Sequence, residues 1–187
     1  MLCLSCADAA RDDLCTRCAG TLSPAPEQHL GSVLVRAAFV HEGAARRLVH
    51  RLKYEALEAA AGPLARAMAQ ILPGHAQCLV PVPRVVARRW RYGVDSGVAV
   101  TAIVARLTGL PVVHALRPAF WVARRAGQAG GRRGIPRFTL TRHPGEGAIL
   151  VDDVVTTGTT LCAAARVATA CHAVTATSAL RGTAVRP

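Results

Sequence analysis

The chain has 187 residues, of which 51% are hydrophobic, and it carries a formal net charge of +12 with an isoelectric point of about 10.9. This composition excludes an intrinsically disordered chain and provides the core of one domain of ordinary size together with a small appendage. No stretch approaches the roughly 18 consecutive apolar residues of a membrane-spanning helix, so we expect no membrane insertion.

The positive charge is compatible with a nucleic-acid surface or with a pocket for a polyanionic small ligand. Lys53 is the only lysine among the 23 basic residues. Arginine combined with abundant alanine, valine and glycine is also the product of a GC-rich coding bias, which needs no functional explanation. The first residues, MLCLSCADAARDD, lack the basic and apolar segments of a secretion signal. We therefore expect a cytoplasmic protein.

Two Cys-x-x-Cys pairs dominate the N-terminus, and they comprise Cys3, Cys6, Cys15 and Cys18. The chain has seven cysteines, and this odd number argues against a disulfide framework. Two such turns can present four thiolates tetrahedrally to Zn²⁺, and a piece this small needs a metal to fold. We expect residues 1–22 to form a zinc-ribbon-like appendage and residues 23–31, which include Ser-Pro-Ala-Pro, to form a linker. The alternative is four reduced cysteines on a frayed terminus.

The remaining residues, 32–187, alternate between strand and helix patterns. The expected strands are residues 32–41, 77–83, 110–116, 147–153 and 172–180. Helical patterns cover residues 42–72, with an interruption near Gly62-Pro63, residues 95–109, with Asp95 or Ser96 as the N-cap, and residues 158–170. Residues 121–138 read as a mobile basic loop. This alternation predicts an α/β domain with a mostly parallel sheet flanked by helices.

The sequence AILVDDVVTTGTTL, residues 148–161, carries the strongest chemical signal. An apolar strand leads into Asp152 and Asp153 where ligands bind in open α/β sheets, at the carboxyl edge. The threonine-rich turn that follows opens a helix, whose free N–H groups suit a phosphate, and Gly158 permits close approach of the backbone. The two carboxylates would be compatible with sugar hydroxyls or with Mg²⁺ between them. The alternative is a strand–turn–helix corner with two solvated aspartates and threonine caps.

This stretch resembles the signature for phosphoribosyl pyrophosphate (PRPP) in type I phosphoribosyltransferases. The resemblance implies a type I phosphoribosyltransferase-like fold in which Asp152 and Asp153 hold the ribose hydroxyls, with Mg²⁺ bound beside PRPP. The residues that it would place at PRPP are Val155, Thr156, Thr157, Gly158, Thr159, Thr160, Pro83, Arg84 and Lys53. A loop with Arg124, Arg125, Gln128, Arg132 and Arg133 could close over the ligand. If the chain is an enzyme, pyrophosphate leaves the anomeric carbon as an acceptor nitrogen attacks.

A double Cys-x-x-Cys head joined to a PRPP-type domain is similar to the ComF family of competence-associated proteins. The segments RLVHRLKY (residues 47–54) and LVPVPR (residues 79–84) also resemble that family. Where the family has Arg-Gly-Phe-Asn-Gln, this chain has YGVDS at residues 92–96. That departure lies in the region that would meet the acceptor, so it weakens a catalytic role more than PRPP binding.

Three hypotheses follow from the sequence. The first is a phosphoribosyltransferase with an unidentified acceptor. The second is a non-catalytic protein that senses a nucleotide and serves DNA uptake together with competence proteins. The third is a zinc-headed protein that binds single-stranded DNA and retains an unused pocket. The histidines show no metal-ligand spacing, and we interpret His41, His50, His75, His114, His143 and His172 as ordinary surface or strand-end residues.

Overall fold

The structure is a computed structural model, and it describes residues 1–83, 95–118 and 136–180. Several residues singled out in the sequence lie outside these ranges, and nothing further is said of their structure. They are Arg84, Tyr92, Gly93, Val94, Arg124, Arg125, Gln128, Arg132 and Arg133.

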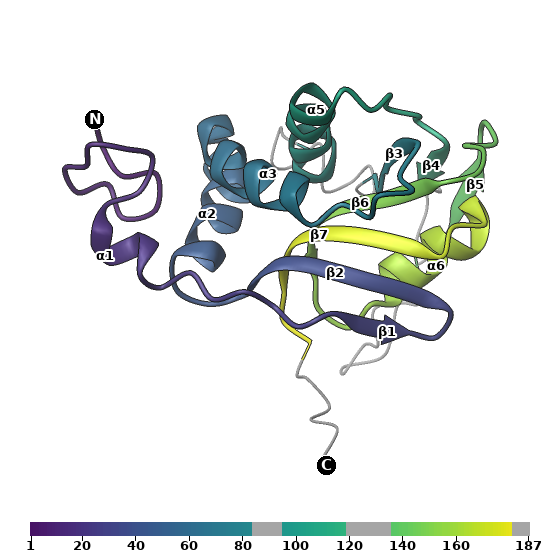
Figure 1. The fold of residues 1–187 in the computed structure, drawn as a ribbon, viewed down its shortest axis with the longest axis horizontal. Coiled ribbons are helices and arrows are strands. Elements are labelled where there is room, and N and C mark those ends of the chain that lie inside the picture. The colour runs from purple at the N-terminus through teal and green to yellow at the C-terminus, as the bar shows by residue number, and fades with distance from the viewer. Residues whose placement is uncertain (84–94, 119–135, 181–187) are drawn as a thin grey trace, which may run out of the picture.

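A five-stranded sheet forms the centre of the molecule, with strand order β1-β2-β7-β6-β3 (Figure 1). Its strands are β1 (Gln28–Leu30), β2 (Val33–Val40), β3 (Cys78–Pro81), β6 (Ala148–Val155) and β7 (His172–Ser178). The strands β2, β7, β6 and β3 run parallel to one another, and β1 pairs antiparallel with β2. The predicted α/β class with a mostly parallel sheet is therefore confirmed.

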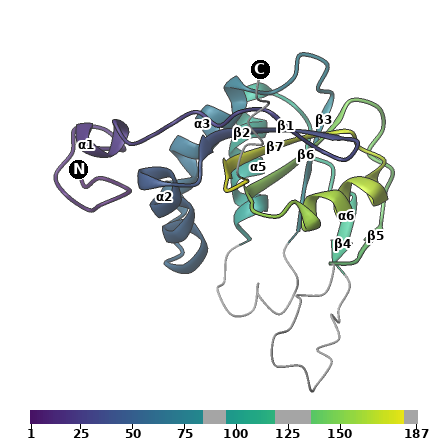
Figure 2. The same ribbon diagram turned by 90° about the horizontal axis from the view of Figure 1, so that it is seen from below.

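Helices cover both faces of the sheet, as Figures 1 and 2 show together. One face packs against α2 (Gly43–Tyr54), α3 (Ala61–Gln70) and α5 (Ser96–Thr108), and Leu64, Val100 and Ile149 are fully buried there. The other face packs against α6 (Thr159–Ala168), where Leu161 meets Leu150 in a second cluster. The strand β6 is buried between these two layers. This position explains the continuous apolar run that precedes Asp152 in the strand.

The break within the predicted helical segment lies earlier in the chain than expected. The helix α2 ends at Tyr54, Ala56 adopts a left-handed φ of 52°, and a short 3-10 turn, η1 (Glu58–Ala60), leads into α3. Pro63 does not interrupt α3, because it occupies the first turn. The N–H that proline lacks would have had no intrahelical partner there.

Three further segments differ from expectation. Residues 110–116 do not form a full strand: Val112 makes one parallel bridge to Leu79, and β4 (Leu116–Pro118) then pairs antiparallel with β5 (Phe138–Leu140) as a separate two-stranded sheet. The start of β5 lies inside the segment expected to be a loop. The strand β1 lies within residues 23–31, which were expected to form a linker. Residues 28–30 form a strand because they pair with β2, which their composition does not predict.

The cysteine-containing N-terminus folds as a compact appendage beside α2, with one short helix, α1 (Thr16–Ala19) (Figure 1). Cys3 and Cys18 are buried there against Ala44 of α2. Within the described part of the chain, no helix is both long and apolar enough to cross a membrane.

Candidate functional site

The paired acids lie in the second half of β6, close to the carboxyl edge of the sheet. Their side chains have different surroundings, because successive residues of a strand point to opposite faces. Asp153 is buried, with 3% of its surface exposed, whereas Asp152 is partly exposed. The two acids therefore differ in their access to a ligand.

Asp153 is held by side chains from two different helices. Lys53, near the end of α2, places its Nζ 2.7 Å from Asp153 Oδ1. Ser96, the first residue of α5, donates a hydrogen bond from its Oγ to Asp153 Oδ2. The sequence predicts that Lys53 lies at PRPP. The structure places its ammonium group at the carboxyl edge of the sheet, in contact with Asp153.

Two residues of this network were not expected from the sequence. Thr177 of β7 is fully buried, and its Oγ1 donates to the backbone oxygen of Asp153 at 3.3 Å. His41, directly after β2, has its Nδ1 2.8 Å from Thr177 Oγ1. Burial lowers the pKa of His41, as do Lys53 and Arg46, against the opposite effect of Asp153. His41 is thus a strand-end residue, as interpreted, but it belongs to the edge with the acids.

Asp152 lies beside the start of α5. Its Oδ1 accepts a hydrogen bond from the Asp153 N–H at 2.8 Å. A Cβ on Gly97 would lie 3.5 Å from Asp152 Oδ1 and 2.9 Å from the backbone oxygen of Val82, so glycine lets α5 approach the strand ends closely. Asp95 caps α5 by accepting from the Val98 N–H at 3.4 Å.

Burial and the neighbouring charge of Asp153 raise the pKa of Asp152 from its ordinary value of 3.8 to about 8. Asp95 adds to this increase, while Lys53 and the hydrogen bond from the Asp153 N–H oppose it. Asp152 is therefore the acid whose charge would be stabilised by a cation or by hydrogen-bond donors of a ligand.

The threonine-rich turn connects β6 to α6 as predicted. Gly158 has a φ of 74° and precedes a helix start that no side-chain hydrogen bond caps. Thr156, Thr157 and Thr159 are exposed, and the hydroxyl oxygens of Thr157 and Thr159 lie 3.0 Å apart. The Thr157 and Thr159 hydroxyls are thus hydrogen-bonded to each other, and the uncapped N–H groups beside these exposed hydroxyls can bind an anion.

The space beside Gly158 is occupied by protein. A Cβ at this position would collide with Cδ1 of Leu30, a residue of β1. The glycine is therefore explained by its positive φ and by the packing of β1, whereas the sequence suggested that it admits a phosphate. The remaining predicted PRPP residues Val155, Thr160 and Pro83 also lie at this edge; Val155 is buried, and Pro83 follows the end of β3.

The four N-terminal cysteines form the second candidate site. Their sulfur atoms all lie within 4.8 Å of one another, and Cys6 Sγ and Cys15 Sγ are 3.7 Å apart. Four thiolates at about 2.3 Å from a tetrahedral Zn²⁺ would be about 3.8 Å apart. The cluster fits these dimensions, so Cys3, Cys6, Cys15 and Cys18 could bind a metal such as zinc.

The surroundings of the cysteines favour thiolates at two of the four positions. Burial raises the pKa of Cys3, but hydrogen bonds from the backbone of Cys15, Cys6 and Ser5 outweigh it and lower the pKa to about 6. At Cys18 burial is likewise outweighed by hydrogen bonds, chiefly from Ser5 and Arg47, and the pKa is lowered. These two sulfurs lie on the buried side of the cluster.

Basic side chains of the helical layer attach the appendage to the domain. Arg47 of α2 donates from Nε to Ser5 Oγ at 2.9 Å and from Nη2 to Cys18 Sγ at 3.5 Å. Arg51 donates to the backbone oxygen of Leu4 at 3.1 Å, and Arg66 of α3 pairs with Asp13. The appendage is therefore fixed to α2 and α3 by side chains as well as by the chain connection.

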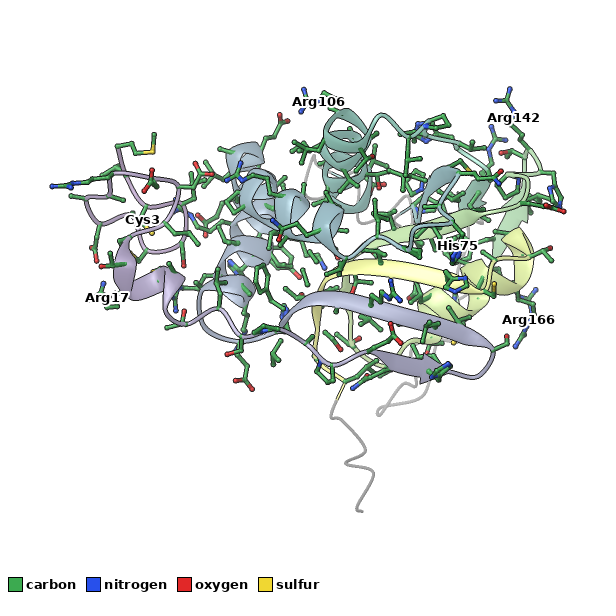
Figure 3. All side chains as sticks on the ribbon, in the orientation of Figure 1. Cys3, Arg17, His75, Arg106, Arg142 and Arg166 are labelled. Carbon is green, nitrogen blue, oxygen red and sulfur yellow. The ribbon has the colours of Figure 1, made fainter. Side chains whose placement is uncertain are left out.

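Several further arginines of the described ranges are exposed on the surface. Figure 3 labels the exposed residues Arg17, Arg106, Arg142 and Arg166, which project outward at widely separated places.

The chain matches no known protein family in the comparison with family models, and no curated protein matches it.

The raised pKa of Asp152 predicts how stability depends on pH. An acid whose pKa is higher in the folded state stabilises the fold below its unfolded pKa of 3.8, and this contribution is lost as the pH rises through about 8. The group interacts with Asp153, Lys53 and Asp95. In magnesium-free buffer, Asp152→Asn should become increasingly stable relative to the parent as the pH rises.

Urea unfolding at a series of pH values from about 5 to about 9 measures this difference. Glu146→Gln removes an exposed carboxyl group elsewhere and serves as the control. If Asp152→Asn and the parent lose stability in parallel over this range, the surroundings inferred for Asp152 are wrong.

Proposed function

We propose that the carboxyl edge of the sheet binds PRPP, or a related phosphorylated ribose, together with Mg²⁺. The observation that carries this proposal is the continuity of residues 152–160. The acids at the end of a central strand lead directly into an uncapped helix start with exposed threonines. Carboxylates suit sugar hydroxyls and hard cations, and helix N-termini suit phosphates. One ligand with both features therefore fits this stretch.

The parts of the site would have distinct tasks. The N–H groups at the start of α6 and the hydroxyls of Thr156, Thr157 and Thr159 would hold the 5′-phosphate. Asp152, with its raised pKa, would accept from ribose hydroxyls or contact Mg²⁺, which supplies charge neutralisation for the pyrophosphate when bound. The net charge of +12 would favour the approach of so anionic a ligand.

If turnover occurs, the reaction would be phosphoribosyl transfer to an acceptor nitrogen. The bond between the anomeric carbon and pyrophosphate breaks as the bond to nitrogen forms, and the pyrophosphate leaves with the electron pair. The protein would contribute mainly position and electrostatics. Pro83 lies at this edge, while Arg84 and the predicted closing loop lie outside the described residues.

The resemblance to the ComF family supports the same proposal and adds a cellular setting. The double Cys-x-x-Cys head, the RLVHRLKY and LVPVPR segments and the PRPP-type stretch occur together in one chain. On this basis a role in competence and DNA uptake is the physiological context that we propose.

A non-catalytic nucleotide sensor is the second candidate. It is favoured by the position of Asp153, because both of its carboxylate oxygens contact protein groups, Lys53 and Ser96. The altered YGVDS segment at residues 92–96 points the same way. The two candidates differ in one measurable respect: only the transferase releases pyrophosphate from PRPP.

Calorimetric titration with PRPP and Mg²⁺ tests the proposed ligand. We expect binding of about one PRPP per chain, and loss of binding in the Asp152→Asn/Asp153→Asn variant because the ligand contacts at the strand end disappear. Glu146→Gln should bind like the parent. A folded, metal-loaded parent that does not bind PRPP would refute the proposal. If PRPP binds, an assay of pyrophosphate release with candidate acceptors separates the enzyme from the sensor.

We also propose that the four cysteines hold a structural Zn²⁺. The spacing of the four sulfurs supports this proposal. The purified protein should contain about one zinc ion per chain by elemental analysis. The Cys6→Ser/Cys15→Ser variant should lose it, and proteolysis of residues 1–22 should become faster because their fold depends on the metal.

Cys162→Ser removes a cysteine of α6, far from the cluster in sequence, and should keep the zinc content of the parent. Zinc retained in the Cys6→Ser/Cys15→Ser variant, or absent from protein purified without chelators, would contradict the structural zinc site.

A further inference from the structure

We propose that Lys53 and Ser96 are positioning residues that hold Asp153 inside the protein, so that Asp152 alone of the paired acids meets the ligand. The identity of that ligand rests on the function proposed above. The contacts of Asp153 do not rest on it, and they can be tested without any ligand.

The ion pair between Lys53 and Asp153 is buried. The Lys53 side chain is 14% exposed and that of Asp153 is 4% exposed, with 2.7 Å between Nζ and Oδ1. A carboxylate this deeply buried loses its hydration, and its charge is tolerated only with a compensating partner. Lys53 is that partner, since it reaches Asp153 from the last turn of α2.

The other carboxylate oxygen of Asp153 also accepts a hydrogen bond from the protein. Ser96 is fully buried and donates to Oδ2. The start of α5 is fixed by the Asp95 cap and by the close approach of Gly97 to Val82. Thr177 holds the backbone oxygen of Asp153 from β7. The carboxylate is therefore fixed by α2, α5 and the sheet together.

Lys53 and Asp153 are buried against each other, with Nζ 2.7 Å from Oδ1, so neither group is presented to a ligand. Asp152 is partly exposed, and it lies at the same edge as the uncapped start of α6. A phosphorylated ribose would thus meet one carboxylate, Asp152, and would not meet the Lys53 ammonium group.

The lysine content of the chain permits a direct test, because Lys53 is its only lysine. Trace acetylation of the folded protein modifies two kinds of amine, the Lys53 side chain and the N-terminus. Met1 is 75% exposed, so its amine serves as an internal reference. A second isotope, added after unfolding, normalises both sites, and mass spectrometry gives the labelling rate of Lys53 relative to the N-terminus.

We expect Lys53 to be labelled much more slowly than the reference in the full-length, metal-loaded parent. Asp153→Asn should increase the relative rate several-fold, and Asp152→Asn, the adjacent matched control, should change it much less because Asp152 makes no ion pair with Lys53 among the described contacts. Fast labelling of Lys53 in the parent overturns the proposal, and this result is available even if Asp153→Asn fails to fold. An increase in Asp152→Asn alone also overturns it.

A thermodynamic cycle tests whether Lys53 acts through Asp153 in PRPP binding. Lys53→Met should weaken PRPP binding in the parent, because Asp153 is then left without its partner, and should cause no further loss in the Asp153→Asn background. Lys53→Arg should restore much of the binding. An equal loss in both backgrounds would show that Lys53 contacts the ligand directly, which contradicts the proposal.

The two tests separate the possible failures. If the parent does not bind PRPP, the proposed function fails together with the ligand half of this inference, while the labelling result still decides whether Lys53 holds Asp153. If PRPP binds but Lys53 is labelled freely, the positioning role fails and the proposed function stands.

Discussion

The buried charge of Asp153 is the constraint on which the arrangement of this edge depends. A carboxylate with 3% of its surface exposed needs partners at both oxygens, and the partners come from α2 and α5. The helical layer therefore cannot shift along the sheet without breaking these contacts. By holding α5 against the strand ends, they also place Gly97 and Asp95 beside Asp152.

The helix α2 connects the two candidate sites. Arg47 and Arg51 contact the cysteine appendage, while Lys53 contacts Asp153. Residues 47 and 51 are four apart and share one face of the helix, which is the spacing needed to hold an adjoining segment. The appendage thus packs on the same helix that supplies the counter-charge at the carboxyl edge, and a metal that orders the appendage would also support α2.

Much of this arrangement could be predicted from the sequence, and the exceptions have physical causes. The apolar run before Asp152, the helix after Gly158 and the clustered cysteines depend on local patterns, and the structure confirms each of these elements. The partners of Asp153 could not be predicted, because Lys53 and Ser96 are distant in sequence and meet only through packing. The same holds for His41 and Thr177. The β4–β5 pair was missed because three-residue strands carry too weak a pattern.

The most direct test of the central claim is amide hydrogen exchange, measured with and without saturating PRPP and Mg²⁺. A ligand held by the uncapped helix start should slow exchange at residues 159–161, the first turn of α6, whose N–H groups have no intrahelical acceptor. The cysteine appendage, which is fixed separately on α2, should change little. Slower exchange confined to residues 1–22, or no change anywhere along the chain, would contradict the assignment of this edge as the ligand site.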